Sequence, residues 1–111
     1  MLEIQANDVG KAVVLHVAGR MDAETSVEFE TTCVSWIDRG AKHLVVDLAG
    51  LQYVSSMGLS KFLAVAKALQ PKSGSLSLCH LEGVPRQVFE MTRLIQLFPV
   101  FDSVEAAVAS L

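Results

Sequence analysis

Several features that would point directly to a function are scarce or missing in this sequence. Cysteine occurs only twice, at Cys33 and Cys79, far apart within apolar segments, which predicts two buried thiols and no disulfide framework. The nine Lys and Arg residues are scattered along a chain of net charge −3, so a nucleic-acid surface is not expected. No apolar run approaches the ~20 residues of a membrane-spanning helix, and the segment MLEIQAND lacks the basic and apolar regions of a signal peptide. We therefore expect a cytoplasmic protein without direct membrane insertion.

Motifs for catalysis and for cofactor binding are also absent. The sequence contains no Gly-x-Ser-x-Gly elbow, no P-loop and no Gly-x-Gly-x-x-Gly fingerprint. The histidines His16, His43 and His80 are expected to be isolated structural or surface residues that form no site. Asp22 is expected to cap a helix, and Asp47 to accept hydrogen bonds from loop amides at the end of a strand. These observations predict a protein that is not an enzyme and holds no metal ion or cofactor.

What is present is the composition of a folded domain, with 51% apolar and 19% charged residues in 111. Hydrophobic periodicity, turn residues and helix-capping residues divide this single domain, residues 1–111, into alternating elements. The expected strands are 2–6, 11–18, 43–48, 75–80 and a short one near 100–101, and the expected helices are 23–38, 57–70, 85–96 and 103–110. After an initial hairpin, strands and helices alternate. This order predicts an α/β fold with a mixed sheet and helices packed mainly on one face.

Apolar residues at helical spacing predict which face of each helix is buried. For the first helix these residues are Phe29, Cys33, Trp36 and Ile37. For the second they are Leu59, Phe62, Leu63, Ala66 and Leu69, and for the third Val88, Met91, Leu94 and Ile95. The opposite face of the second helix, with Met57, Lys61 and Val65, is therefore expected to be open to a partner.

The most informative segment is DLAGLQYVSSMGLSKFL, residues 47–63, which predicts a buried strand, a short loop and a helix beginning near Met57. Ser55 and Ser56 stand at the entrance of that helix. A serine there can cap the helix by accepting a hydrogen bond from an unpaired backbone N–H. It can also carry a phosphate, because the helix dipole and the exposed amides favour negative charge.

Four segments, in order and at ordinary spacing, resemble the STAS domain, the fold of bacterial anti-sigma factor antagonists and of the cytoplasmic tails of sulfate transporters. They are VVLHVAGRMDAET, HLVVDLAGLQYVSSMGL, SGSLSLCHLEGVPRQVFEMTRL and LFPVFDSVEAAVASL. Together they cover nearly the whole chain. The resemblance implies a STAS-like fold and a role in regulating transcription through protein–protein interaction.

In that family the signature loop commonly reads Asp-Ser-Ser-Gly-Leu, and a partner kinase phosphorylates the second serine. The corresponding residues here are Ser55, Ser56, Met57, Gly58 and Leu59, so a methionine stands at the usual acceptor position. A variant pattern, Ser-Ser-Ala-Gly-Leu, is closer to this sequence. The resemblance therefore implies Ser56 as the phosphorylated residue, with Ser55 as second choice. The alternative is that Ser56 only caps the helix and Ser55 only turns the loop.

The resemblance also implies the partner, a serine kinase that is itself an anti-sigma factor, bound by a monomer or weak dimer of this chain. The expected partner-binding residues are Asp22, Tyr53, Ser55, Ser56, Met57, Gly58, Lys61 and Val65. A second hypothesis is a permanent STAS subunit of a lipid-transport ATPase, in which the same helix docks without phosphorylation. A third is the binding of a small ligand, for which no residue argues beyond the fold.

Overall fold

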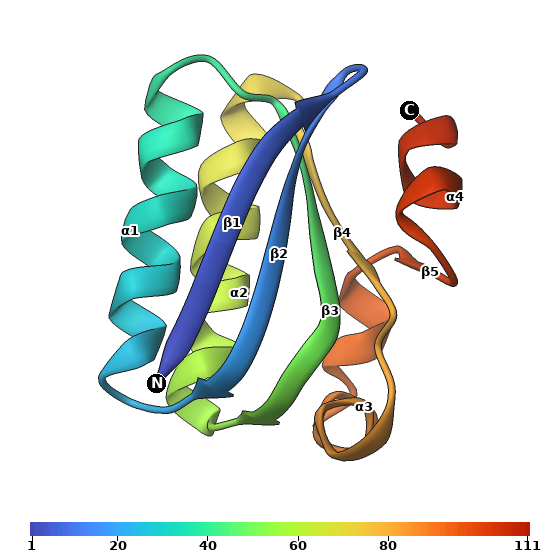
Figure 1. Cartoon of the computed structure of the whole chain (residues 1–111). Coiled ribbons are helices and arrows are strands. Elements are labelled where there is room, and N and C mark those ends of the chain that lie inside the picture. The colour runs from blue at the N-terminus through green and yellow to red at the C-terminus, as the bar shows by residue number, and fades with distance from the viewer.

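A computed structural model describes all residues, 1–111, as one five-stranded sheet flanked by helices (Figure 1). The strands are β1 (Leu2–Val9), β2 (Ala12–Met21), β3 (His43–Val54), β4 (Ser75–Cys79) and β5 (Val100–Phe101). The helices are α1 (Thr25–Asp38), α2 (Ser56–Leu69), α3 (Gly83–Met91) and α4 (Val104–Ala109), with 3-10 turns η1 (Gln70–Lys72) and η2 (Leu94–Leu97). The predicted α/β fold with an initial hairpin is confirmed.

The sheet has the strand order β1-β2-β3-β4-β5, which is also the order along the chain. β1 and β2 form an antiparallel hairpin in which Val9 lies opposite Ala12, so the turn consists of Gly10 and Lys11. Gly10 has a φ of 60°, a left-handed conformation that glycine adopts without strain. All later strand pairs are parallel, because each is joined to the next by a helix.

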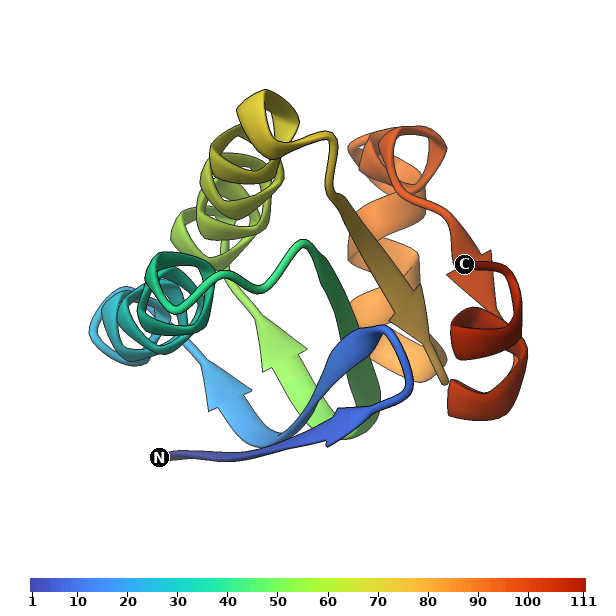
Figure 2. The same cartoon turned by 90° about the horizontal axis from the view of Figure 1, so that it is seen from above.

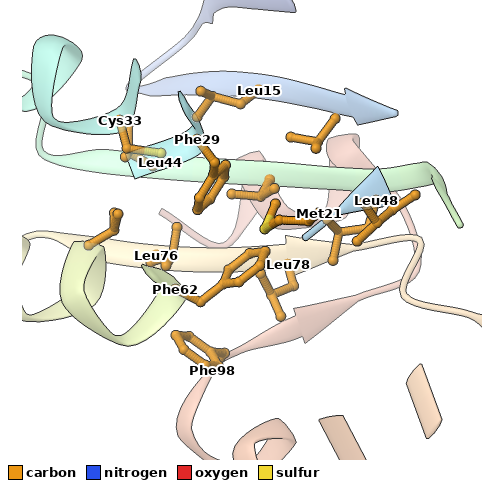
Figure 3. Close-up of a cluster of buried hydrophobic side chains, with 14 of the residues drawn as sticks. Leu15, Met21, Phe29, Cys33, Leu44, Leu48, Phe62, Leu76, Leu78 and Phe98 are labelled. Atoms are coloured by element: carbon orange, nitrogen blue, oxygen red, sulfur yellow. The ribbon is translucent and has the colours of Figure 1, made fainter. Parts of the chain in front are cut away.

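One face of the sheet carries most of the core. Figure 2 shows α1, α2 and α3 on one side of the strands, and the main cluster of 22 buried residues fills the space beneath them. Aromatic rings from three helices meet there: the Phe62 ring of α2 lies 4.7 Å from the Phe29 ring of α1 and 5.4 Å from the Phe89 ring of α3, centroid to centroid. Figure 3 shows Phe29, Phe62 and Phe98 packed around the leucines of β3 and β4. The prediction that helices pack mainly on one face is confirmed.

The other face is only partly covered. The short helix α4 packs there through Ala107, against Val14, Val45 and Cys79 of the central strands. Figure 1 shows α4 set apart from α1 and α2 across the sheet. The rest of this face, over β1 and the carboxyl halves of β2 and β3, is open. None of the helices combines the length and the apolar character needed to cross a membrane.

Several elements differ from the predicted bounds: β1 and β2 each end three residues later than expected, at Val9 and Met21, and β3 and α3 differ most. The loop expected after Leu48 is instead a continuation of β3 to Val54, because β2 stays paired with it through two register irregularities. The helix expected over 85–96 ends at Met91, since Arg93 adopts a left-handed φ of 62°. As a result Met91 is 83% exposed and not inward, while Phe89, which the periodicity missed, is fully buried.

Candidate functional site

The entrance of α2 lies where β2 and β3 end side by side. The N–H of Ser55 donates to the carbonyl oxygen of Met21 at 2.9 Å, which ties the two strand ends together. Ser55 itself has an extended backbone, and its Oγ accepts a hydrogen bond from the N–H of Gly58 at 3.1 Å. Ser55 is therefore the N-cap of α2, and α2 begins at Ser56, one residue before its expected start.

This arrangement corrects the alternative reading of the two serines, in which Ser56 was the cap. Ser56 is the first residue of the helix, and its side chain is exposed. Met57 follows and is 47% exposed. The first turn of α2 contains no acidic residue, so its positive dipole end and free amides are not neutralised by the chain.

Gly58 is buried beneath this entrance and packs tightly. A Cβ atom at this position would lie 2.8 Å from Cγ2 of Val54 and 3.1 Å from Cγ of Met21. Contacts below 3.0 Å are repulsive, so the absence of a side chain lets α2 approach the ends of β2 and β3. Gly58 thus sets the position of Ser56 and does not itself present a surface to a partner.

Asp22 forms the neighbouring entrance, that of α1. Its Oδ1 accepts hydrogen bonds from the N–H groups of Thr25 at 2.9 Å and Glu24 at 3.0 Å. The Thr25 N–H lowers the pKa of Asp22 below its ordinary value, and with the Thr25 hydroxyl and the Glu24 N–H it outweighs the effect of burial. The expected capping role of Asp22 is confirmed, although the first residue of α1 is Thr25.

Tyr53 lies near the end of β3, opposite Arg20 of β2. The guanidinium carbon of Arg20 is 4.4 Å from the centre of the Tyr53 ring, within the range of a cation–π contact. Arg20 is a surface residue that sequence reasoning did not select, because its neighbourhood with Tyr53 depends on the strand register. It brings a positive charge to the same edge of the sheet as Ser56.

Two residues expected on the exposed face of α2 lie elsewhere. Val65 is fully buried in the main core, so it cannot contact a partner. Lys61 points toward α1, where its Nζ lies 2.9 Å from Oε1 of Glu30. The inward stripe of α2 is Leu59, Phe62, Val65 and Leu69, since α2 packs against both the sheet and α1. The buried face of α2 is therefore rotated relative to the predicted one. Contrary to the prediction, Lys61 and Val65 do not lie on a face open to a partner.

A second polar cluster lies on the open face of the sheet, away from this entrance. Asp47 of β3 meets two histidines: His16 Nδ1 is 2.7 Å from Oδ2, and His80 Nδ1 is 2.9 Å from Oδ1. The expectation that the histidines are isolated is therefore wrong for His16 and His80. Asp47 lies within β3 and not at a strand end, although its Oδ1 also accepts from the N–H of Ala49, as expected for a local amide.

Hydrogen bonds within this cluster stabilise the charged forms of His80 and Asp47. The hydrogen bond to Asp47 raises the pKa of His80 above its ordinary value. Burial alone would raise the pKa of Asp47, but hydrogen bonds from His80, Ala49 and His16 lower it on balance. Asp47 is consequently a carboxylate at neutral pH.

With the fold and both clusters described, comparison with known proteins is informative. The family model described as the STAS domain matches residues 3–107. BtrV of Bordetella bronchiseptica, named as an anti-sigma factor antagonist, is 32% identical over 109 residues, which cover 98% of this chain and 94% of BtrV. The chain belongs to the STAS domain family. Its relatives support a STAS regulatory module.

Solved structures agree on the fold. An anti-sigma factor antagonist from Mycobacterium paratuberculosis superposes with a TM-score of 0.89 at 21% identity, covering 99% of this chain and 93% of the other. The Bacillus cell fate determinant SpoIIAA, solved in its phosphorylated form, gives a TM-score of 0.73 at 21% identity, covering 94% and 96% of the two chains. At these identities the likeness concerns the fold.

Proposed function

We propose that this protein is a non-enzymatic anti-sigma factor antagonist that binds a serine kinase acting as anti-sigma factor, and that phosphorylation of Ser56 releases the partner. The proposal rests on a difference between the two serine side chains at the entrance of α2. Ser55 Oγ is held in the capping hydrogen bond, whereas the adjacent Ser56 side chain is exposed. An exposed hydroxyl is the one a kinase can reach, so Ser56 is preferred over Ser55.

Electrostatics favour a phosphate at this position within the domain itself. A phosphoserine carries about −1.5 to −2 charges at neutral pH. At Ser56 that charge would lie over the unneutralised first turn of α2, with Arg20 at the same edge of the sheet. Phosphorylation is therefore expected to leave the fold unchanged. The named SpoIIAA structure shows that a STAS relative does exist in a phosphorylated form.

The phosphate would instead weaken the binding of the partner. The proposed docking surface consists of Asp22, Tyr53, Ser56 and Met57 around the entrance of α2. Exposed Met57 suits such a surface, because a methionine side chain adapts to varied partners. A partner shaped for a neutral hydroxyl would have to desolvate the phosphate without a matching positive group, at several kcal/mol. Since about 1.4 kcal/mol is a factor of ten in affinity, one phosphate is enough to release the partner.

The direct test is phosphorylation by a serine kinase that is first identified as a binding partner of this protein by pull-down. The purified chain, the kinase and ATP are incubated, and the product is mapped by mass spectrometry. One phosphate on Ser56 is expected, and its amount should fall to background in Ser56→Ala. Kinase binding without modification of Ser55 or Ser56 would retain the docking role and reject the switch.

Binding measurements test release separately. Ser56→Asp should weaken kinase binding at least about tenfold, whereas Ser56→Ala should change it by less than about threefold. The matched control is Ser73→Asp, which adds the same charge to an exposed residue beyond the opposite end of α2, where a left-handed φ of 55° tolerates aspartate. Equal losses from Ser56→Asp and Ser56→Ala would contradict the phosphate switch.

A further inference from the structure

The largest pocket of the protein, about 590 Å³, lies at the end of the sheet opposite the entrance of α2. Its walls come mainly from the turn that joins β1 to β2 and from the loop between α1 and β3. Figure 1 shows both segments at the upper end of the molecule, whereas α2 begins at the lower end. The pocket is therefore separate from the proposed docking surface, and its volume suits a small organic ligand.

Three positively charged side chains from separate positions in the chain line this pocket. They are Lys11 of the hairpin turn, Arg39 at the end of α1, and Lys42 immediately before β3. All three are exposed, and the four ion pairs of the protein involve other residues. The whole chain has only nine Lys and Arg residues and a net charge of −3. Since Asp8 is the only acidic residue of the lining, positive charge is in excess there, and it attracts anions into the pocket.

One of these cations is oriented by an aromatic ring. The guanidinium carbon of Arg39 is 4.9 Å from the centre of the Trp36 ring, which itself packs against the main core. A guanidinium that already rests on a ring loses less conformational freedom on binding, and its planar fork matches two oxygens of a phosphate. Trp36 and Ala41 also give the pocket an apolar wall. This combination fits a ligand that has both a phosphate and a carbon skeleton.

The carboxyl end of α1 borders the same pocket, and unpaired carbonyl groups there would repel an anion. These carbonyl groups are already occupied. The carbonyl oxygen of Ile37 accepts from the N–H of Gly40 and from Nζ of Lys72, each at 2.9 Å. The carbonyl oxygen of Trp36 accepts from the N–H of Ala41 at 3.1 Å. Lys72 also adds a positive charge at the end of the helix, so the repulsion is reduced.

We propose that this pocket binds a small phosphate ester, with its phosphate on Lys11, Arg39 and Lys42 and its carbon skeleton against Trp36. A phosphate ester carries about −1.5 to −2 charges at neutral pH, as a phosphoserine does, and so matches several cations better than a singly charged carboxylate. The assignment concerns the opposite end of the domain from Ser56 and does not depend on the proposed function.

The test uses phenyl phosphate as the probe. Trp36 is the only tryptophan in the chain, so its fluorescence reports on this pocket directly. Phenyl phosphate should change that fluorescence in a saturable way, and calorimetric titration should give the same dissociation constant. Phenol lacks the phosphate and should bind at least about tenfold more weakly, because hydrogen bonds between charged groups are worth at least that factor.

Substitutions locate the binding. Arg39→Gln and Lys42→Gln should each weaken the binding of phenyl phosphate at least about tenfold. The matched control is Lys67→Gln, which removes an exposed lysine of α2 that lies outside the pocket and should leave binding unchanged. Asp8→Asn removes the one carboxylate of the lining and should instead tighten binding roughly twofold. Circular dichroism verifies that each variant is folded.

Several results would overturn the assignment. They are an absence of phenyl phosphate binding by the wild type, binding that survives both Arg39→Gln and Lys42→Gln, or an equal loss in Lys67→Gln. Phenol that binds as tightly as phenyl phosphate would reject recognition of the phosphate. Weaker binding by Asp8→Asn would show that excess positive charge does not attract the probe.

Discussion

The backbone N–H of Gly58 donates a hydrogen bond to Ser55 Oγ at 3.1 Å, so the first of the two adjacent serines is committed to the fold of α2. We expect Ser55→Ala to lower the free energy of unfolding by about 1 kcal/mol, the usual effect of losing an N-cap. Ser56→Ala removes an exposed hydroxyl and should change it by less than about 0.5 kcal/mol. Urea denaturation of the three proteins measures both values. A larger loss from Ser56→Ala than from Ser55→Ala would reverse the assigned roles.

Gly58 gives a second prediction about the same entrance. A methyl group there would overlap Cγ2 of Val54, a stiff β-branched side chain, so Gly58→Ala should cost about 1–3 kcal/mol in packing. Alanine also gains about 1 kcal/mol in helix propensity, which leaves a net loss of roughly 1 kcal/mol. Chemical denaturation again provides the measurement.

A double-mutant cycle identifies the cause of that loss. In a Val54→Ala background the overlapping methyl is absent, so Gly58→Ala should become neutral or stabilising, with a coupling energy above about 0.5 kcal/mol. Additive effects of the two substitutions would show that the contact with Val54 is not responsible.

Phe62 connects the helices that cover the main core. Its ring contacts those of Phe29, Phe89 and Phe98, and it is fully buried. Phe62→Ala should therefore lower the free energy of unfolding by about 3–5 kcal/mol, a large part of the stability of a small domain. Phe101, half-buried beside α4, is the control, and Phe101→Ala should cost clearly less. Similar losses at both positions would mean that the two clusters contribute equally.

The fold was largely predictable because its elements have local signals. β1 begins with alternating apolar and polar residues, β2 is rich in β-branched residues, and Asp22 and Gly40 lie near the ends of α1. Tertiary contacts decided the remainder. Ala49 and Gly50 disfavour a strand directly after Leu48, yet pairing with β2 extends β3 through them to Val54. The burial of Val65 depends on how α2 sits between α1 and the sheet, which helical periodicity alone does not determine.

The two clusters differ in how visible they were beforehand. Ser55 and Ser56 are adjacent in the sequence, so their position at a helix entrance could be predicted, although which one caps the helix required the backbone. His16, Asp47 and His80 are separated by more than 30 residues at each step. Only the parallel register places them together, and a strand pattern does not specify register between distant strands.

Asp22 gives a prediction about pH. Hydrogen bonds at the entrance of α1, first that from the Thr25 N–H, lower the pKa of Asp22 in the folded state below its ordinary value of 3.8. The folded protein therefore binds this proton more weakly than the unfolded chain does. The stabilisation is complete above pH 3.8 and is lost as the pH falls through the lower folded-state pKa. Unfolding free energies measured by urea denaturation from neutral pH to below pH 3 should show this loss.

Two substitutions at the same position separate the charge from the hydrogen bonds. Asp22→Asn keeps an oxygen that can accept from the Thr25 and Glu24 amides but cannot titrate, so its stability should fall less than that of the wild type in acid. Asp22→Ala removes the acceptor and should be less stable than the wild type at neutral pH. Its deficit should shrink on acidification, because protonation removes the same carboxylate from the wild type. Parallel curves for all three proteins would mean that the Asp22 carboxylate does not stabilise the start of α1.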